Sequence, residues 1–245
     1  MSYPRDFYFQ ASSGEISGLT STNKFGSNPD IDIASVPETV WSPGGLYVFP
    51  TSSGSIEVLS TSPADTAAGT GARTITIEGL NDEYEKITET FTLDGGNPVS
   101  SSLWTNWFRV YRAFVTTAGL QEKNAGEINI RLGATTLATI PPEEGQTQMA
   151  IFSIPADKKG YVTSITGSIL KTGPNRSADI ALYQKVNGVI RKMYEFNIET
   201  TGSTTFTQNF KTPIQFNEKT DIYINVTNVS ANSTAVFASF NVIVQ

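Results

Sequence analysis

The sequence predicts an all-β protein: two β-sandwich, jelly-roll-like domains preceded by an extended N-terminal arm. Three observations carry this prediction. Apolar and hydroxyl-bearing residues alternate over 74–77 and over 87–93, and a period of two is typical of a half-buried strand. Similar segments recur along the chain with turn residues between them. No segment of ten or more residues has helical periodicity.

The composition agrees with this fold class. The chain has 245 residues, enough for one large β domain or two of ordinary size. Only 16% of the residues are charged, below the roughly 25% that is usual in globular domains. Serine, threonine, asparagine and glycine make up the difference, as expected for sheets whose outer faces carry hydroxyl groups.

Cysteine and histidine are both absent from the sequence. Without them there is no disulfide framework, no thiolate nucleophile, no Ser-His-Asp triad and no histidine-ligated zinc. These exclusions remove most common catalytic arrangements. We therefore expect no enzyme activity, no cofactor and no metal site.

The charges divide unevenly along the chain. Residues 1–145 carry 8 basic and 17 acidic residues, a net of −9, and residues 146–245 carry 9 and 6, a net of +3. This asymmetry favours two units with different surroundings. Nucleic acid is not an expected partner, because no basic stripe is present to neutralise phosphates. Pairs such as Lys158-Lys159 are expected to be solvated.

The first residues lack a signal peptide, and no apolar run approaches the ~18 residues of a membrane span. We therefore expect a chain that is made and assembled in a cytoplasm, with no membrane partner.

Residues 1–45 have little periodicity and are rich in Gly, Ser, Pro and Asn, which predicts an extended arm. Such an arm would lie across a neighbouring subunit, held by Phe7, Phe9, Phe25 and Trp41. The alternative is a loop-rich cap on its own domain. A long structureless stretch is uncommon inside a compact domain, which gives weight to the arm.

The first sandwich is expected over 46–140, and its strands are predicted by alternation and spacing. These strands are expected at 46–50, 56–59, 74–77, 87–93, 110–115 and 127–132. Residues 79–82 are predicted to form the turn between the strands at 74–77 and 87–93. The segment 138–149, stiffened by Pro141-Pro142, is the predicted linker.

The second sandwich is expected over 146–245. Its strands are predicted at 150–154, 161–165, 180–186, 190–198, 221–226 and 235–244. Asn187-Gly188 predicts a tight hairpin, because both residues tolerate the positive φ of a type I′ turn.

Two short motifs resemble ligand sites. Gly69 and Gly71 precede a strand, whereas a phosphate-binding loop follows a strand and precedes a helix, so we interpret them as a turn. Asn28, Asp30 and Asp32 alternate as calcium ligands can, but the rest of an EF-hand loop is missing. We expect these three residues to be solvated or to cap a turn.

Carboxylates and aromatic residues offer two further candidates. The acids near the turn at 79–82 would keep a hairpin tip hydrated, although paired carboxylates in a cleft could hydrolyse a glycoside. Glu89 differs, because it lies in the apolar register of its strand, which predicts a bulge, an edge or a subunit contact.

The aromatic residues of 104–114 are expected to be core or interface residues, with sugar stacking as the alternative. The predicted subunit or shell contacts are Phe7, Phe9, Phe25, Trp41, Trp104 and Trp107.

Several strings resemble a family of virion structural proteins from tailed phages and related environmental viruses. They are NKFG and NPDID in 23–32, SPADTAAGTGARTITIEGLN at 62–81, TETFTLDG at 88–95, FRVYRAFVTTAG at 108–119, NAGEINI at 124–130, and IPPEEGQTQM leading to FSIPADKKGYVTS at 140–164. The resemblance covers roughly residues 20–170. It implies a virion location and carries no catalytic motif.

The resemblance leads to a first hypothesis, a capsid decoration, cement or minor capsid protein that stabilises the shell. Its partners would be the major capsid protein and further copies of itself, with a trimer as the specific prediction. It would lie on the capsid surface after assembly in the host cytoplasm. The second hypothesis is a tail, collar or fibre component whose second sandwich binds a host glycan. The third is a glycan-degrading enzyme.

Overall fold

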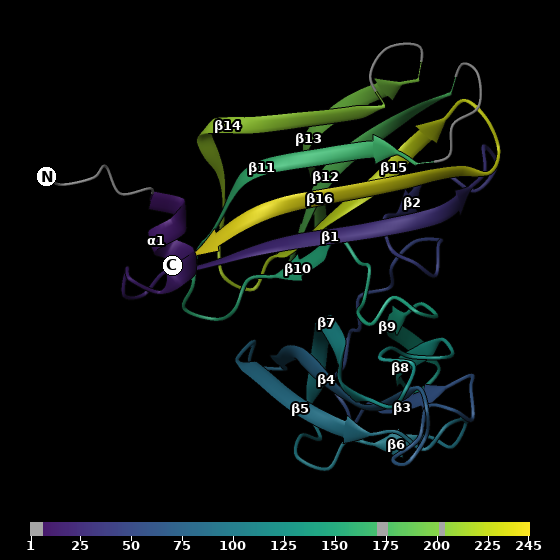
Figure 1. The fold of residues 1–245 in the computed structure, drawn as a ribbon. Helices are drawn as coiled ribbons and strands as arrows, with labels where there is room; N and C mark the ends of the chain where they lie inside the picture. Colours follow the sequence, from purple (N-terminus) through teal and green to yellow (C-terminus); the bar gives the residue numbers. More distant parts are fainter. Residues whose placement is uncertain (1–6, 171–175, 201–203) are drawn as a thin grey trace, which may run out of the picture. The chain divides into compact units, whose positions relative to one another are not determined.

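The computed structural model describes residues 7–170, 176–200 and 204–245, and it divides the chain into two compact units. Unit 1 combines Met1–Val40 with Ala150–Gln245, and unit 2 is Trp41–Met149. Within the described residues there are sixteen β-strands and one short helix, α1 (Phe7–Ser13), so the predicted all-β class is confirmed (Figure 1). No described helix has the length and apolar character that a membrane crossing requires.

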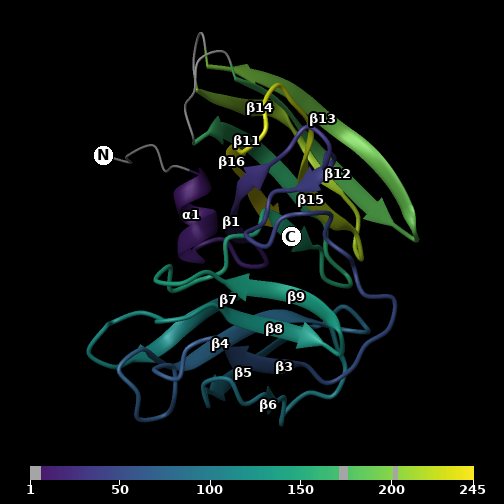
Figure 2. The same ribbon diagram turned by 90° about the vertical axis from the view of Figure 1, so that its right-hand side faces the viewer.

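Unit 1 consists of two antiparallel sheets that face each other (Figures 1 and 2). The first sheet has the order β1 (Thr20–Ile31), β16 (Thr234–Val244), β11 (Gly160–Ile169) and β14 (Thr205–Phe216). The second has the order β10 (Ile151–Ser153), β15 (Asp221–Val229), β12 (Ser177–Val186) and β13 (Val189–Glu199), and β2 (Glu38–Thr39) also pairs with β15.

The core of unit 1 lies between these sheets. Gly167 on β11 faces the opposite sheet so closely that an added Cβ would lie 2.8 Å from both Ile180 and Phe196. The rings of Phe196 and Phe206 stack across the sheets with centroids 4.6 Å apart. Gly167 thus marks a position where the two sheets approach each other closely. Apolar side chains of both sheets fill the space beside it.

The predicted hairpin at Asn187-Gly188 is confirmed. Val186 and Val189 are register partners in β12 and β13, and the two turn residues have φ values of 50° and 80°. Both angles are positive, as the type I′ turn requires.

The prediction of an arm over 1–45 is wrong for most of its length. Residues 20–31 form β1, an edge strand paired along its length with β16, and Glu38–Thr39 form β2 in the other sheet. Residues 41–45 belong to unit 2, and residues 1–6 of the predicted arm lie outside the described residues. The segment is therefore part of a sandwich, because its backbone hydrogen-bonding groups are used in two sheets.

Unit 2 contains two smaller antiparallel sheets. One has the order β6 (Val99–Ser100), β3 (Glu57–Ser60), β8 (Ile128–Leu132) and β9 (Thr135–Ile140), and the other has β5 (Lys86–Thr92), β4 (Ala72–Asn81) and β7 (Trp107–Ala118). The alternation that predicted β4 and β5 is present, since Ile75 and Ile77 are buried and the hydroxyls of Thr76 and Thr90 lie 2.9 Å apart on the other face. The described backbone at 46–50 forms no strand, although Tyr47 and Phe49 are buried.

The turn after β4 begins later than predicted. β4 continues through Gly79 to Asn81, whose side-chain oxygen accepts hydrogen bonds from the backbone N–H groups of Glu83 and Glu85 at 3.0 and 2.8 Å. Gly79 is needed in the strand, because a Cβ there would lie 2.1 Å from the carbonyl oxygen of Arg109. The predicted linker also differs, since residues 138–140 belong to β9 and the remainder of 138–149 lies in unit 2.

The buried carboxylate of Asp65 joins the loop before β4 to the loop before β8 and to the end of β3. Its oxygens accept hydrogen bonds from the backbone N–H groups of Ala72, Ala125 and Gly126 at 2.7, 2.8 and 2.9 Å, and from the Ser60 hydroxyl at 2.6 Å. A buried carboxylate is stable when it is hydrogen-bonded in this way. We refer to this arrangement as the Asp65 hub.

Gly71 belongs to the same arrangement, because a Cβ there would lie 2.1 Å from Asp65 Oδ1. Gly71 therefore makes room for a carboxylate that accepts the backbone N–H of the next residue, Ala72.

Candidate functional site

Two of the predicted contact residues are core residues of unit 2, so their assignment as contacts is wrong. Trp41 and Trp107 are only 6% and 0% exposed. The Trp107 ring lies against Gly79, and its Nε1 donates to Ser101 Oγ at 3.0 Å. Trp41 Nε1 donates to the carbonyl of Gly44 at 2.8 Å. Both indoles are satisfied inside the unit, and neither is available to a partner.

The other four predicted contact residues reach the surface but do not form one patch. Phe7 and Phe9 are exposed on α1, and Phe25 is half-buried on β1, where it stacks on Phe237 with centroids 6.3 Å apart. These residues belong to unit 1, whereas the half-buried Trp104 belongs to unit 2. A single aromatic contact surface made of the six residues is therefore not present within either unit.

Two aromatic rings near Trp104 in the sequence are in contact with arginine side chains of unit 2. The guanidinium of Arg109 lies 3.9 Å from the Phe108 ring centroid, and that of Arg112 lies 4.7 Å from the centroid of Phe114. Cation–π contacts of this kind cover one ring face each. Burial raises the pKa of the Tyr111 hydroxyl, and the nearby Glu78 carboxylate adds to the shift while Arg112 opposes it. This cluster is part of the packing of unit 2 rather than an open platform for sugars.

Glu89 is the residue that fixes the loop after β6. Its carboxylate is buried and accepts hydrogen bonds from the Ser101 hydroxyl, from the backbone N–H and hydroxyl of Ser102 at 2.7 and 3.1 Å, and from the N–H of Leu103 at 3.2 Å. Burial alone would raise the pKa of Glu89, but these hydrogen bonds outweigh it and hold the pKa below its ordinary value. The acid in an apolar register is thus an internal clamp on a loop.

The clamped loop presents an apolar side chain to solvent. Leu103 is 70% exposed although its backbone is held by Glu89, and the neighbouring Trp104 donates from Nε1 to the Thr88 carbonyl at 3.2 Å. We call Ser101–Trp104 the Leu103 loop. An exposed apolar residue on a fixed backbone suits a protein contact, because less conformational entropy is lost on binding.

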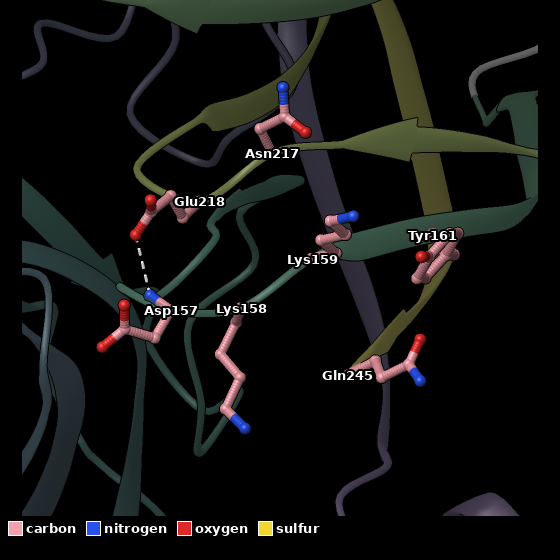
Figure 3. Close-up of a pocket in the computed structure, with 7 residues that line it drawn as sticks. All are labelled: Asp157, Lys158, Lys159, Tyr161, Asn217, Glu218 and Gln245. Carbon is pink, nitrogen blue, oxygen red and sulfur yellow. Dashed lines mark hydrogen bonds between the residues drawn. The ribbon is translucent and has the colours of Figure 1, made fainter.

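A polar basin lies at one end of unit 1 and has a volume of about 570 Å³. Three separate parts of the chain line it: the β10–β11 connection with the start of β11, the β14–β15 connection, and the residue after β16. Figure 3 shows their side chains around the opening. The lining residues are Asp157, Lys158, Lys159, Tyr161, Asn217, Glu218 and Gln245.

Backbone hydrogen bonds hold the walls of this basin. Lys159 and Gln245 exchange two N–H to carbonyl bonds of 3.0 and 2.9 Å, and the N–H of Lys219 donates to the carbonyl of Ile154 at 2.9 Å. Glu218 also accepts the backbone N–H of Asp157 at 2.8 Å, a bond drawn in Figure 3. The basin is therefore formed by fixed backbone, while its charged side chains remain exposed.

An apolar groove of about 340 Å³ adjoins the basin through the two residues they share, Tyr161 and Gln245. Its apolar lining comes from α1, the residue before β1, and strands β11, β14 and β16. These side chains are Phe7, Tyr8, Leu19, Tyr161, Pro213 and Ile243.

The other sequence candidates do not form sites. Within the part of the chain that the structure describes, no cluster of three or more acidic side chains could hold a metal ion. Asn28 is buried and donates to Glu38 Oε2 at 2.8 Å, whereas Asp32 accepts the N–H of Ser233 at 2.8 Å, so the alternating oxygens do not converge. Sequence reasoning identified the pair Lys158-Lys159 but missed the basin, because its walls are far apart in the sequence.

No family model matches this chain, and no curated protein matches it either. Among solved structures, the chain has 13% identity and a TM-score of 0.20 to the PBSX exported protein XepA, over 91% of this chain and 84% of that one. It has 10% identity and a TM-score of 0.22 to a structure of the infectious bursal disease virus Gt strain, over 99% and 74%. These are loose likenesses, one to an exported protein and one to a virus structure, and at such TM-scores they carry no argument.

Proposed function

We propose that this protein is a structural component of a virion, a capsid decoration, cement or minor capsid protein that stabilises the shell through subunit contacts. The observation that supports this most directly is the Leu103 loop. Four hydrogen bonds to one buried carboxylate hold this loop, two of them from backbone N–H groups, and the Leu103 side chain of the loop is exposed. Because the Leu103 side chain is exposed, it adds little to the packing of unit 2. An exposed apolar side chain on a fixed loop favours a contact with another subunit.

The strings that resemble virion proteins agree with a scaffolding role. The string at 62–81 contains Asp65 and Gly71, the string at 88–95 contains Glu89, and the string at 124–130 contains Asn124 and Gly126. In unit 2 these residues hold loops in place: Asn124, for example, donates to the carbonyls of Gly126 and Pro141 at 2.7 Å each. Their contribution is to rigidity, which a shell component needs and which requires no catalytic group.

The proposed partners are the major capsid protein and other copies of this chain, arranged as a symmetric trimer on the capsid surface after assembly in the host cytoplasm. Repeated contacts among many copies would add stability that a single weak contact lacks. The protein is proposed to have no enzymatic activity: the two carboxylates of the basin, Asp157 and Glu218, are exposed and lack the water-excluded setting that suits a general acid.

The test compares Leu103→Asp with Leu120→Asp in purified particles. Leu120 is a suitable control, because it is also in unit 2 and is 91% exposed, but it lies in a different loop. We expect Leu103→Asp to lower incorporation per particle by about tenfold or more, and Leu120→Asp to leave it unchanged. A cryo-electron microscopy map should place many ordered copies over the shell.

Equal incorporation of both variants would remove the Leu103 loop from the proposal. A map with a few copies at one vertex or along the tail would overturn the shell location. That result would favour the second candidate, a tail, collar or fibre component, for which the polar basin of unit 1 is the specific supporting observation.

A further inference from the structure

We propose that the polar basin of unit 1 binds an uncharged glycan, with one sugar in the basin and the next sugar on the adjoining apolar groove. This inference does not depend on where the protein lies in a particle. It starts from the size of the basin, because about 570 Å³ is within the roughly 300–1,000 Å³ that is usual for small-molecule sites.

The lining selects a ligand with many hydrogen-bonding groups. Asn217 and Gln245 carry amides that both donate and accept, and Asp157 and Glu218 are acceptors for hydroxyl groups. An apolar ligand would leave these groups without partners as it displaced water, which is unfavourable. A polyhydroxylated ligand satisfies donors and acceptors together.

The charges of the lining exclude a strongly anionic ligand. Lys158 and Lys159 supply two positive charges, and Asp157 and Glu218 supply two negative charges, so the side chains sum to zero. A phosphate or sulfate group would meet two carboxylates as well as two ammonium groups in the same lining, and like charges repel. The basin therefore fits a neutral sugar better than a nucleotide or a sulfated glycan.

The groove supplies the apolar surface on which a sugar ring can pack. A sugar ring has hydroxyls on its rim and C–H groups on its faces, and the C–H faces pack on aromatic and aliphatic side chains. Tyr161 is shared by the basin and the groove, and Pro213 and Ile243 continue the apolar surface beyond it. One ligand that spans both regions needs alternating polar and apolar surfaces, as an oligosaccharide has.

The backbone around the basin is already fixed, so binding would order side chains but little backbone. The paired hydrogen bonds of Lys159 with Gln245 hold two of the three walls together, and the bond from Asp157 to Glu218 joins the third. A preformed site of this kind loses less entropy when its ligand binds.

The experiment applies the full-length protein to a glycan array that contains neutral, uronic-acid-bearing and sulfated oligosaccharides. We expect binding to neutral members. Titration with the strongest neutral binder should then show about tenfold weaker binding for Tyr161→Ala and for Asn217→Ala, and little change for Tyr161→Phe, which keeps the ring. Gln121→Ala is the control, because Gln121 is an exposed glutamine of unit 2.

Saturation-transfer NMR with a concentrated mixture of glucose, galactose, mannose, rhamnose and N-acetylglucosamine provides a second readout that tolerates weak binding. Absence of binding in both experiments overturns the proposal. Binding that is restricted to anionic glycans, or that survives Tyr161→Ala and Asn217→Ala, also overturns it. Particle incorporation is measured separately, so failure here leaves the proposed structural role to its own test.

Discussion

The Asp65 carboxylate and the backbone N–H of Ala125 are 2.8 Å apart, although 60 residues separate them in the sequence. The same carboxylate also accepts the N–H groups of Ala72 and Gly126, and it is fully buried. One side chain therefore ties together loops that lie before β4 and before β8. Unit 2 depends on this charge being present and fully hydrogen-bonded.

Replacement of Asp65 by asparagine should destabilise unit 2. The asparagine amide places N–H donors opposite N–H groups of the loops, so at least one hydrogen bond to a charged acceptor is lost and buried donors are left unsatisfied. We expect a loss of roughly 2–4 kcal/mol in the free energy of unfolding, measured by urea denaturation. Asp94→Asn is the matched control, because Asp94 is exposed, and it should change stability by less than about 0.5 kcal/mol. Equal effects of the two substitutions would refute the role of the hub.

Glu89 should make the stability of unit 2 depend on pH in the acid range. Its pKa is lowered in the folded protein from an ordinary value of 4.5, so the unfolded chain binds the proton more readily. The stabilisation is therefore complete above pH 4.5 and is lost as the pH falls through the folded-state pKa. Thermal unfolding followed by tryptophan fluorescence should show this loss in the wild type. Glu89→Gln should be less stable at neutral pH and less sensitive to acid, and an unchanged pH profile would contradict the assignment.

Tyr223 should titrate late in alkali. Burial, the nearby Tyr183 and the charge of Asp221 raise the pKa of its hydroxyl from 10.0 to about 12. Because the folded-state pKa is the higher one, the stabilisation is complete below pH 10 and is lost as the pH rises through about 12. The measurement is phenolate absorbance during alkaline titration, as the difference between wild type and Tyr223→Phe. A difference spectrum that appears near pH 10 in the folded protein would contradict this expectation.

Local sequence pattern predicted the strands whose inward residues are apolar. Ile75 and Ile77 in β4 and the Asn187-Gly188 hairpin are examples, since their signals lie within a few neighbouring residues. β1 was missed for a physical reason. Buried and exposed positions alternate along the middle of β1, but the buried positions before Ile31 are Lys24, Gly26 and Asn28. Because these residues are not hydrophobic, the sequence shows no alternation of apolar and polar residues there.

The candidate sites were less predictable than the strands. A tryptophan can serve a core or an interface equally well, and only the packing of Trp41 and Trp107 decided between them. The basin depends on pairing between strands that are distant in sequence, which brings Gln245 beside Lys159. No local motif encodes that proximity. The sequence does not indicate that Leu103 lies on a fixed, exposed loop, because that loop is held by Glu89, twelve to fourteen residues earlier in the chain.

The interruption of unit 1 by unit 2 has a consequence for the order of folding during synthesis. All strands of unit 2 lie within the contiguous stretch Trp41–Met149, whereas β1 has no partner strand until β16, at the far end of the chain, has been made. Val40 and Ala150 are joined by a backbone hydrogen bond of 3.0 Å, so the chain leaves and re-enters unit 1 at neighbouring positions. On the ribosome, unit 2 can complete its core before the partner strand of β1 has been made. Folding of unit 2 would then bring the two halves of unit 1 together.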